Sequence, residues 1–166
     1  MAKEVAKEAA KGVEGVIITH GTDTMHYTSA ALSFALENLN VPVLLVVSQR
    51  SSDRGSSDAG MNLINAVYFA VHSDMKDVAI CMHNSISDNS CAILPGLKTR
   101  KMHTSRRDAF KAVNAKVWAF VDYKKGEIKY VDKSFRKKVN GNLQLKLFNE
   151  KINIGLLKSY VNMDSK

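Results

Sequence analysis

GVIITHGTDTMHYTSAALSF, residues 15–34, is the most informative stretch of this 166-residue sequence. An apolar, β-branched run at residues 13–19 is typical of a strand that is buried on both faces. Residues 20–24 form a polar turn rich in residues that cap helices. Apolar residues then recur at helical spacing, which predicts a helix over residues 25–38. The order strand, turn, helix is the first unit of an α/β fold.

The same order repeats along the first half of the chain. Apolar strands are predicted at residues 43–47 and 77–82, and between them a helix over residues 59–72 with Asp58 placed to cap its start. Strand, helix, strand, helix, strand predicts a parallel sheet with right-handed crossovers and helices on both faces. The expected fold class is therefore α/β, with three layers around a parallel sheet.

The pattern after residue 90 is weaker. A short apolar segment at residues 91–94 precedes a basic stretch at residues 98–111. A further strand is predicted at residues 116–122, and a turn at residues 124–126 leads into another at 127–132.

Composition limits the class of protein. Hydrophobic residues make up 45% and charged residues 24% of the chain, which is enough for one packed domain. No apolar run approaches the roughly 20 residues of a spanning helix, and the charged N-terminus lacks the apolar core of a secretory signal. Two cysteines, Cys81 and Cys91, cannot form a disulfide framework. We therefore expect a soluble, cytoplasmic protein.

Charge is distributed unevenly. Residues 1–95 hold 6 Lys or Arg against 10 Asp or Glu, whereas residues 96–166 hold 18 against 6, for an overall charge of +8. The basic half is compatible with a nucleic-acid partner or with an acidic protein partner.

Polar turns follow each of the first three predicted strands, at residues 20–24, 48–57 and 83–90. Ligands bind at the carboxyl edge of such a sheet, so chemistry is expected where these turns meet. Thr22 and Asp23 stand side by side in the first turn. Their residue types fit helix capping, and they also fit a nucleophile that a nearby base would activate. The histidines and cysteines lack zinc-ligand spacing, so no metal site is predicted.

The string HGTDTM, residues 20–25, directly after a buried strand resembles the second catalytic motif of the asparaginase/glutaminase amidohydrolase family. The resemblance implies a flavodoxin-like or Rossmann-like α/β sheet, as in the N-terminal domain of asparaginases. It makes Thr22 and Asp23 active-site residues and pairs them with a downstream lysine, for which the register of LKTRKMHTSRRDAFKAVN selects Lys101. It also places Gly21 and Ser48 at the substrate, Ser48 through its backbone.

A lysine can act as a base only if its ammonium form is destabilised, by burial or by neighbouring positive charge. Lys98, Arg100, Arg106 and Arg107 supply such charge along the chain near Lys101. Without the family resemblance, the same run of charge fits a solvated basic loop.

Three segments, residues 20–34, 48–67 and 100–110, resemble one branch of the family, which forms the D subunit of archaeal tRNA-dependent amidotransferases. That branch implies hydrolysis of glutamine, or of asparagine, without a cofactor. The ammonia would pass to a partner, the amidotransferase E subunit, which amidates the glutamyl ester on tRNA with ATP and magnesium. The tRNA would be contacted indirectly through that partner, and a homo-oligomer is expected.

The resemblance also predicts how the chain is divided. Residues 1–140 correspond to the N-terminal α/β domain without its first strand and the hinge loop that carries another threonine. Residues 141–166 correspond to a linker and the start of a C-terminal domain. Two other functions remain open from the residues: a free L-asparaginase, and a non-catalytic fragment that binds a partner subunit or tRNA.

Overall fold

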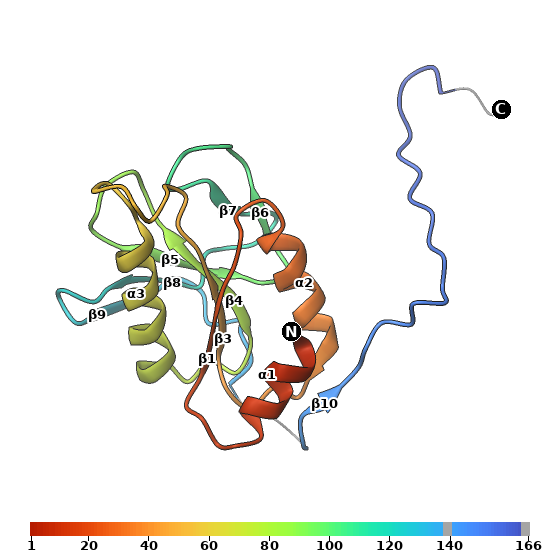
Figure 1. Ribbon diagram of the computed structural model, residues 1–166, viewed down its shortest axis with the longest axis horizontal. Helices are drawn as coiled ribbons and strands as arrows, with labels where there is room; N and C mark the ends of the chain where they lie inside the picture. Colours follow the sequence, from red (N-terminus) through yellow and green to blue (C-terminus); the bar gives the residue numbers. More distant parts are fainter. Residues whose placement is uncertain (138–140, 164–166) are drawn as a thin grey trace.

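A computed structural model describes residues 1–137 and 141–163 of the chain. A central sheet lies between helices on both sides, so the three predicted layers are present (Figure 1). The elements, in chain order, are α1 (Ala2–Ala9), β1 (Val16–Thr19), α2 (Met25–Ala35), β2 (Leu36–Glu37), β3 (Val43–Val46), α3 (Ala59–His72), β4 (Val78–His83), β5 (Cys91–Pro95), β6 (Thr99–Lys101), β7 (Phe110–Ala112), β8 (Ala119–Asp122), β9 (Glu127–Tyr130) and β10 (Gln144–Leu145).

The main sheet has six strands in the order β1-β3-β4-β5-β8-β9. β1, β3 and β4 are parallel, as the repeated strand–helix pattern predicts. β5, β8 and β9 continue the sheet in antiparallel fashion, so the prediction of a parallel sheet holds for the first three strands only. The reason is the connection: the short loop 84–90 returns the chain directly, whereas a parallel neighbour needs a crossover of a dozen residues or more.

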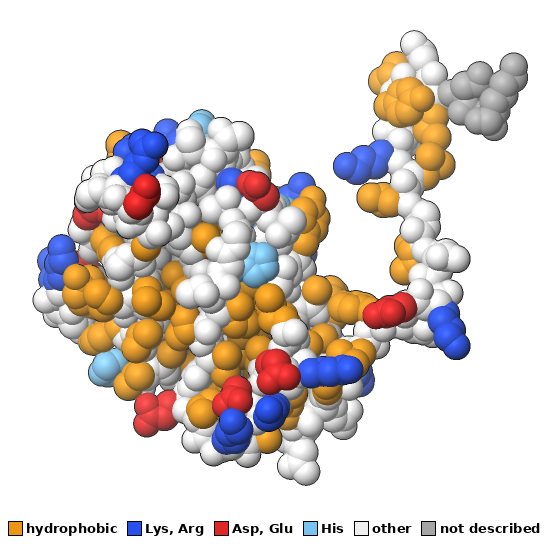
Figure 2. Space-filling model, in the orientation of Figure 1, with side chains coloured by type: hydrophobic (Ala, Val, Ile, Leu, Met, Phe, Trp, Pro, Cys, Tyr) orange, Lys and Arg blue, Asp and Glu red, His pale blue; other side chains and the backbone are white. Residues whose placement is uncertain are grey.

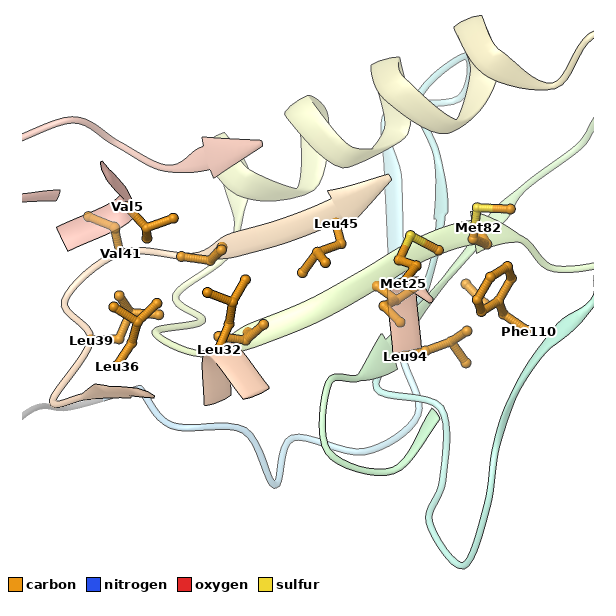
Figure 3. Packing of buried hydrophobic residues seen from close by; sticks show 14 of the residues in the cluster. Val5, Met25, Leu32, Leu36, Leu39, Val41, Leu45, Met82, Leu94 and Phe110 are labelled. Atoms are coloured by element: carbon orange, nitrogen blue, oxygen red, sulfur yellow. The ribbon is translucent and has the colours of Figure 1, made fainter. Parts of the chain in front are cut away.

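The core has one cluster on each face of the sheet. Leu45 on β3 lies in a cluster with Leu32 of α2 (Figure 3). Ile80 on β4 belongs to the same cluster, on the side of the sheet that α1 and α2 cover. The alternate residue Leu44 faces the other side and joins Phe69 of α3. Successive side chains of a strand point to opposite faces, and both faces here are covered, which explains the continuous apolar runs in β3 and β4.

Several predicted boundaries are displaced. The helix expected over residues 25–38 ends at Ala35, because Leu36 and Glu37 adopt an extended conformation and pair with β10 instead. The first strand occupies only the last four residues of the run at 13–19. The strand predicted at residues 116–122 begins at Ala119. The predicted helix over residues 59–72 is observed with those bounds.

Exposed apolar side chains are grouped on α3 and along the segment 146–163. On α3 these are Leu63, Ile64, Val67 and Val71, and Figure 2 shows orange side chains spread across the visible face of the globular part. The segment 146–163 has no helix or strand and runs away from the globular part (Figure 1).

The division predicted at residue 140 falls within residues 138–140, and these, like residues 164–166, lie outside the described residues. That division stays a prediction. None of the helices within residues 1–137 and 141–163 has the length and apolar character needed to cross a membrane.

Candidate active site

The turn between β1 and α2 presents Thr22 and Asp23 at the carboxyl end of the sheet. Thr24 is the residue that precedes α2, and its side chain makes no capping hydrogen bond. The Thr22 hydroxyl instead donates to Asp23 Oδ1 at 3.3 Å. Both side chains therefore take part in a polar cluster at the surface.

Lys101 completes this cluster from the end of β6. Its Nζ donates to Thr22 Oγ1 at 2.8 Å and lies 2.6 Å from Asp23 Oδ1. The Lys101 side chain is 11% exposed, whereas that of Asp23 is 89% exposed, so the cluster lies at an open surface. The hydrogen bond from Lys101, its positive charge and the hydrogen bond from Thr22 together lower the pKa of Asp23 below its usual value.

Apolar packing brings Lys101 to the turn. β6 and β7 form a hairpin in which Lys101 is the register partner of Phe110. Phe110 and Met25, the first residue of α2, are buried in the same cluster (Figure 3). The hairpin is thereby held against the start of the helix, where Thr22 and Asp23 lie.

The positive charges that the sequence places around Lys101 are largely paired in the structure. Arg106 binds Asp108 at 2.9 Å, and Arg107 binds Asp88 at 2.6 Å. Arg100 lies over the ring of Tyr27, 5.7 Å from its centroid. The basic stretch is thus a folded hairpin with specific partners for its arginines, not an unstructured charged loop.

The other two predicted substrate contacts lie close by. Gly21 belongs to the same turn, and its carbonyl oxygen accepts a hydrogen bond from His20 Nδ1 at 2.8 Å. Ser48 follows β3 and lines a cavity of about 320 Å³ together with Thr19 and His20. Thr22, Asp23 and Lys101 are not among the residues that line this cavity. The structure therefore brings the three predicted catalytic residues into contact and places Ser48 in a neighbouring cavity that they do not line.

His26 is a residue that the sequence patterns did not single out. It lies in the first turn of α2, is 8% exposed, and neither ring nitrogen has a partner among the described residues. Burial, followed by the charges of Arg100 and Lys101, lowers its pKa.

A second group that the sequence did not reveal joins the loops around the site. Gln49, after β3, donates to the carbonyl oxygen of Thr104 at 2.6 Å. Asp58 accepts the backbone N–H groups of Gln49 and Arg50, so it closes the loop 48–58 in addition to preceding α3. The clustering of polar residues in the three loops was the signal for this network.

In the part of the chain that the structure describes, no group of three or more His, Cys, Asp or Glu side chains is arranged to hold a metal ion. Cys81 and Cys91 are buried free thiols.

The layered sheet and the Thr–Asp–Lys cluster at its first strand–helix turn define an α/β domain of the asparaginase type. A family model described as "Asparaginase, N-terminal" matches residues 1–136. The chain belongs to the asparaginase family.

Within this family, the chain is similar to the D subunits of archaeal amidotransferases. The chain is 50% identical over 173 aligned positions to the D subunit of glutamyl-tRNA(Gln) amidotransferase from Thermococcus kodakarensis, and 48% identical over 172 to that from Methanococcus vannielii. Each match covers 99% of this chain and 38% of the relative, so the chain spans under two fifths of the relatives' length.

Solved structures agree on the fold. The thermostable L-asparaginase of Thermococcus kodakarensis matches with a TM-score of 0.74 and 31% identity, over 87% of this chain and 40% of that one. L-asparaginase I of Vibrio cholerae matches with a TM-score of 0.72 and 28% identity, over 87% of this chain and 42% of that one.

Proposed function

We propose that the chain is the amidohydrolase core of a tRNA-dependent amidotransferase, which releases ammonia from glutamine. The observation that carries the proposal is the contact of Lys101 with both Thr22 and Asp23, made across almost 80 residues of sequence. A hydroxyl, an amine and a carboxylate in mutual contact are the parts that an activated nucleophile requires. The identity to the D-subunit relatives over nearly the whole chain supports the choice of branch.

The chemistry follows from the three side chains. In the structure the Lys101 ammonium donates to Thr22 and Asp23, so it must first lose a proton to act as a base. The neutral amine then takes the hydroxyl proton of Thr22, whose oxygen attacks the side-chain amide carbon of glutamine. The protonated Lys101 gives that proton to the leaving nitrogen, so that ammonia departs, and water then hydrolyses the ester on Thr22 to release glutamate and restore the hydroxyl. Asp23 holds the amine in place.

Substrate binding is assigned to the same turn. The α-amino group of glutamine is placed near the Asp23 carboxylate, and its carboxylate near the backbone N–H groups of Gly21 and Thr22, which precede the N-terminus of α2. Ser48 contributes a backbone contact to the amide that is cleaved. Hydrolysis by these groups requires no cofactor.

The partners follow from the names of the D-subunit relatives. The released ammonia would be used by the amidotransferase E subunit, which would hold ATP and magnesium and amidate glutamyl-tRNA(Gln). Contact with tRNA would then be mainly indirect, through that partner. A homo-oligomer of the chain itself is part of the same proposal.

The test compares two ammonia sources. The chain is combined with the purified E subunit, ATP, magnesium and glutamyl-tRNA(Gln), and formation of glutaminyl-tRNA is measured with glutamine or with ammonium chloride. We expect Thr22→Ala to abolish the reaction with glutamine and to leave the reaction with ammonium chloride unchanged. Thr28→Ala in α2 is the matched control. Equal glutamine-dependent rates for Thr22→Ala and the unaltered chain would contradict the proposal.

A free L-asparaginase is the second candidate, because the two structural matches above are L-asparaginases. It predicts ammonia release from asparagine in the absence of the E subunit and tRNA, at a rate well above that from glutamine. The same ammonia assay, run on the chain alone with each amide, separates the two functions.

A further inference from the structure

Arg107 connects the Lys101 hairpin to two other loops. Its side chain is 13% exposed, and its guanidinium donates to Asp88 Oδ1 at 2.6 Å and to the carbonyl oxygen of Ser56 at 2.6 Å. Asp88 lies in the loop after β4, and Ser56 in the loop after β3. Arg107 itself belongs to residues 102–109, the loop that begins directly after Lys101. One side chain therefore joins the loops 48–58, 84–90 and 102–109.

Asp88 is held from inside the protein by His83. His83 Nε2 lies 3.0 Å from Asp88 Oδ1, and His83 Nδ1 lies 2.6 Å from Asn62 Oδ1. The amide nitrogen of Asn62 donates to the carbonyl oxygen of Val47 and to Asp58 Oδ2, which fixes Oδ1 as the acceptor end. A carboxylate is also an acceptor. With these two acceptors both ring nitrogens of His83 would donate, which corresponds to the imidazolium form of the ring.

The surroundings of His83 favour that charge. Burial by itself lowers its pKa, but hydrogen bonds to Cys91 and Asp88, with the negative charges of Cys91 and Asp58, raise the pKa above its usual value. Arg107 lies on the other side of Asp88. Asp88 thus stands between two cations, one from the sheet and one from the hairpin loop.

We propose that Arg107 is a positioning residue: through Asp88 and His83 it fixes the loop 102–109 to the sheet, and so holds the Lys101 amine against Thr22 and Asp23. Its neighbour Arg106 provides the contrast, since among the described residues its side-chain hydrogen bonds go to Asp108 of the same loop alone. We call the contacts that join Arg107, Asp88 and His83 the clamp. Its effect on turnover rests on the proposed function, but the clamp itself can be measured without activity.

The experiment follows the Lys101 amine directly. The whole chain is treated with limiting acetic anhydride, and acetylation of Lys101 is quantified by mass spectrometry against exposed lysines of the same molecule. Hydrogen exchange of the peptide 102–109 is measured in parallel. Hydrogen bonds to a charged group hold a loop closed by roughly tenfold or more, so we expect Arg107→Met to raise Lys101 acetylation about tenfold.

A control variant at Arg106 and a double variant of Asp88 and Arg107 test whether the effect comes from the Arg107–Asp88 contact. Arg106→Met should leave Lys101 acetylation within about twofold, because its ion pair with Asp108 lies within the loop 102–109 and does not join that loop to another one. Asp88→Asn should open the loop in the same direction, and Asp88→Asn with Arg107→Met should add little to Arg107→Met alone, because both remove one contact. Arg107→Lys keeps the charge and should restore part of the protection.

Asp88 is 61% exposed, so Asp88→Asn should stay folded even if Arg107→Met does not. Unchanged Lys101 acetylation in folded Asp88→Asn and folded Arg107→Met would overturn the proposal, and so would an equal effect of Arg106→Met. An intact clamp together with no glutamine hydrolysis would instead count against the proposed function alone.

Discussion

The amine of Lys101 lies 2.8 Å from the hydroxyl of Thr22, a residue 79 positions earlier in the chain. The parallel strands β3 and β4 and a return through antiparallel β5 separate the two in sequence. Their contact depends on the β6–β7 hairpin packing on the start of α2 through Phe110 and Met25. A site with one part on a turn and the other on a hairpin is sensitive to changes in either element.

Removing the Lys101 amine tests its role as the base. General base catalysis contributes about 10²–10⁴-fold to a rate, so we expect Lys101→Met to lower glutamine-dependent turnover by at least about 100-fold. Stability should change by less than about 1 kcal/mol, because the partner Asp23 is exposed. Lys98→Met, an exposed lysine in the turn before β6, is the control. Equal turnover of the two variants would refute the assignment.

The charge of His83 can be observed by NMR. Because its pKa is raised, the ring should stay protonated at both nitrogens at about pH 6.5, the ordinary histidine pKa, and lose its proton only as the pH rises further. Asp88→Asn removes one of the groups that favour the charge and should lower the titration midpoint. The measurement is the pH dependence of the ¹⁵N shifts of the ring. A neutral ring with one protonated nitrogen at that pH would contradict the hydrogen-bond assignment.

Gly96 is expected to tolerate no side chain. A Cβ there would lie 2.6 Å from the carbonyl oxygen of Val78 and 2.9 Å from Ser33 Oγ, so Gly96→Ala should destabilise the fold by about 1–3 kcal/mol. Gly60, in the first turn of α3, has open space where a methyl group would be added, with no atom within 4 Å, and Gly60→Ala should stabilise by about 0.5–1 kcal/mol. Urea denaturation of the two variants should give shifts of opposite sign.

The Asp77–Arg136 pair is predicted to stabilise the base of the sheet. Asp77 precedes β4 and accepts hydrogen bonds from Arg136 Nε at 3.2 Å and Nη2 at 2.8 Å. Arg136→Met should lower the free energy of unfolding by about 1–2 kcal/mol. Lys137→Met breaks the more exposed pair with Asp74 and should cost less than about 0.5 kcal/mol. Equal urea midpoints for the two variants would show that the Asp77 pair adds nothing.

The first half of the fold was predictable because its signals are local. Buried parallel strands have continuous apolar sequences, and the helical spacing of apolar residues indicates where a helix such as α3 begins and ends. The antiparallel continuation was not predictable in the same way. β5 is a short apolar segment whose partner and direction depend on how tightly the loop 84–90 turns.

The end of α2 illustrates the same limit. Apolar residues continue at helical spacing beyond Ala35, but Leu36 and Glu37 leave the helix to pair with β10, more than 100 residues later. The pairing with the distant strand β10 ends the helix before its apolar periodicity ends. The sequence of residues 25–38 contains no signal that identifies this partner.

For the candidate site too, one part could be located from local sequence patterns and the other could not. Thr22, Asp23 and the turn that carries them could be located from the chain alone, because a buried strand followed by a capping-rich turn and a helix is a local pattern. The lysine was selected through a family resemblance, and only tertiary structure brought Lys101 to within 2.8 Å of Thr22. The links through Arg107, Asp88 and His83 were invisible until the fold was known, because hydrogen bonds between loops depend on distances in space that no spacing along the chain encodes.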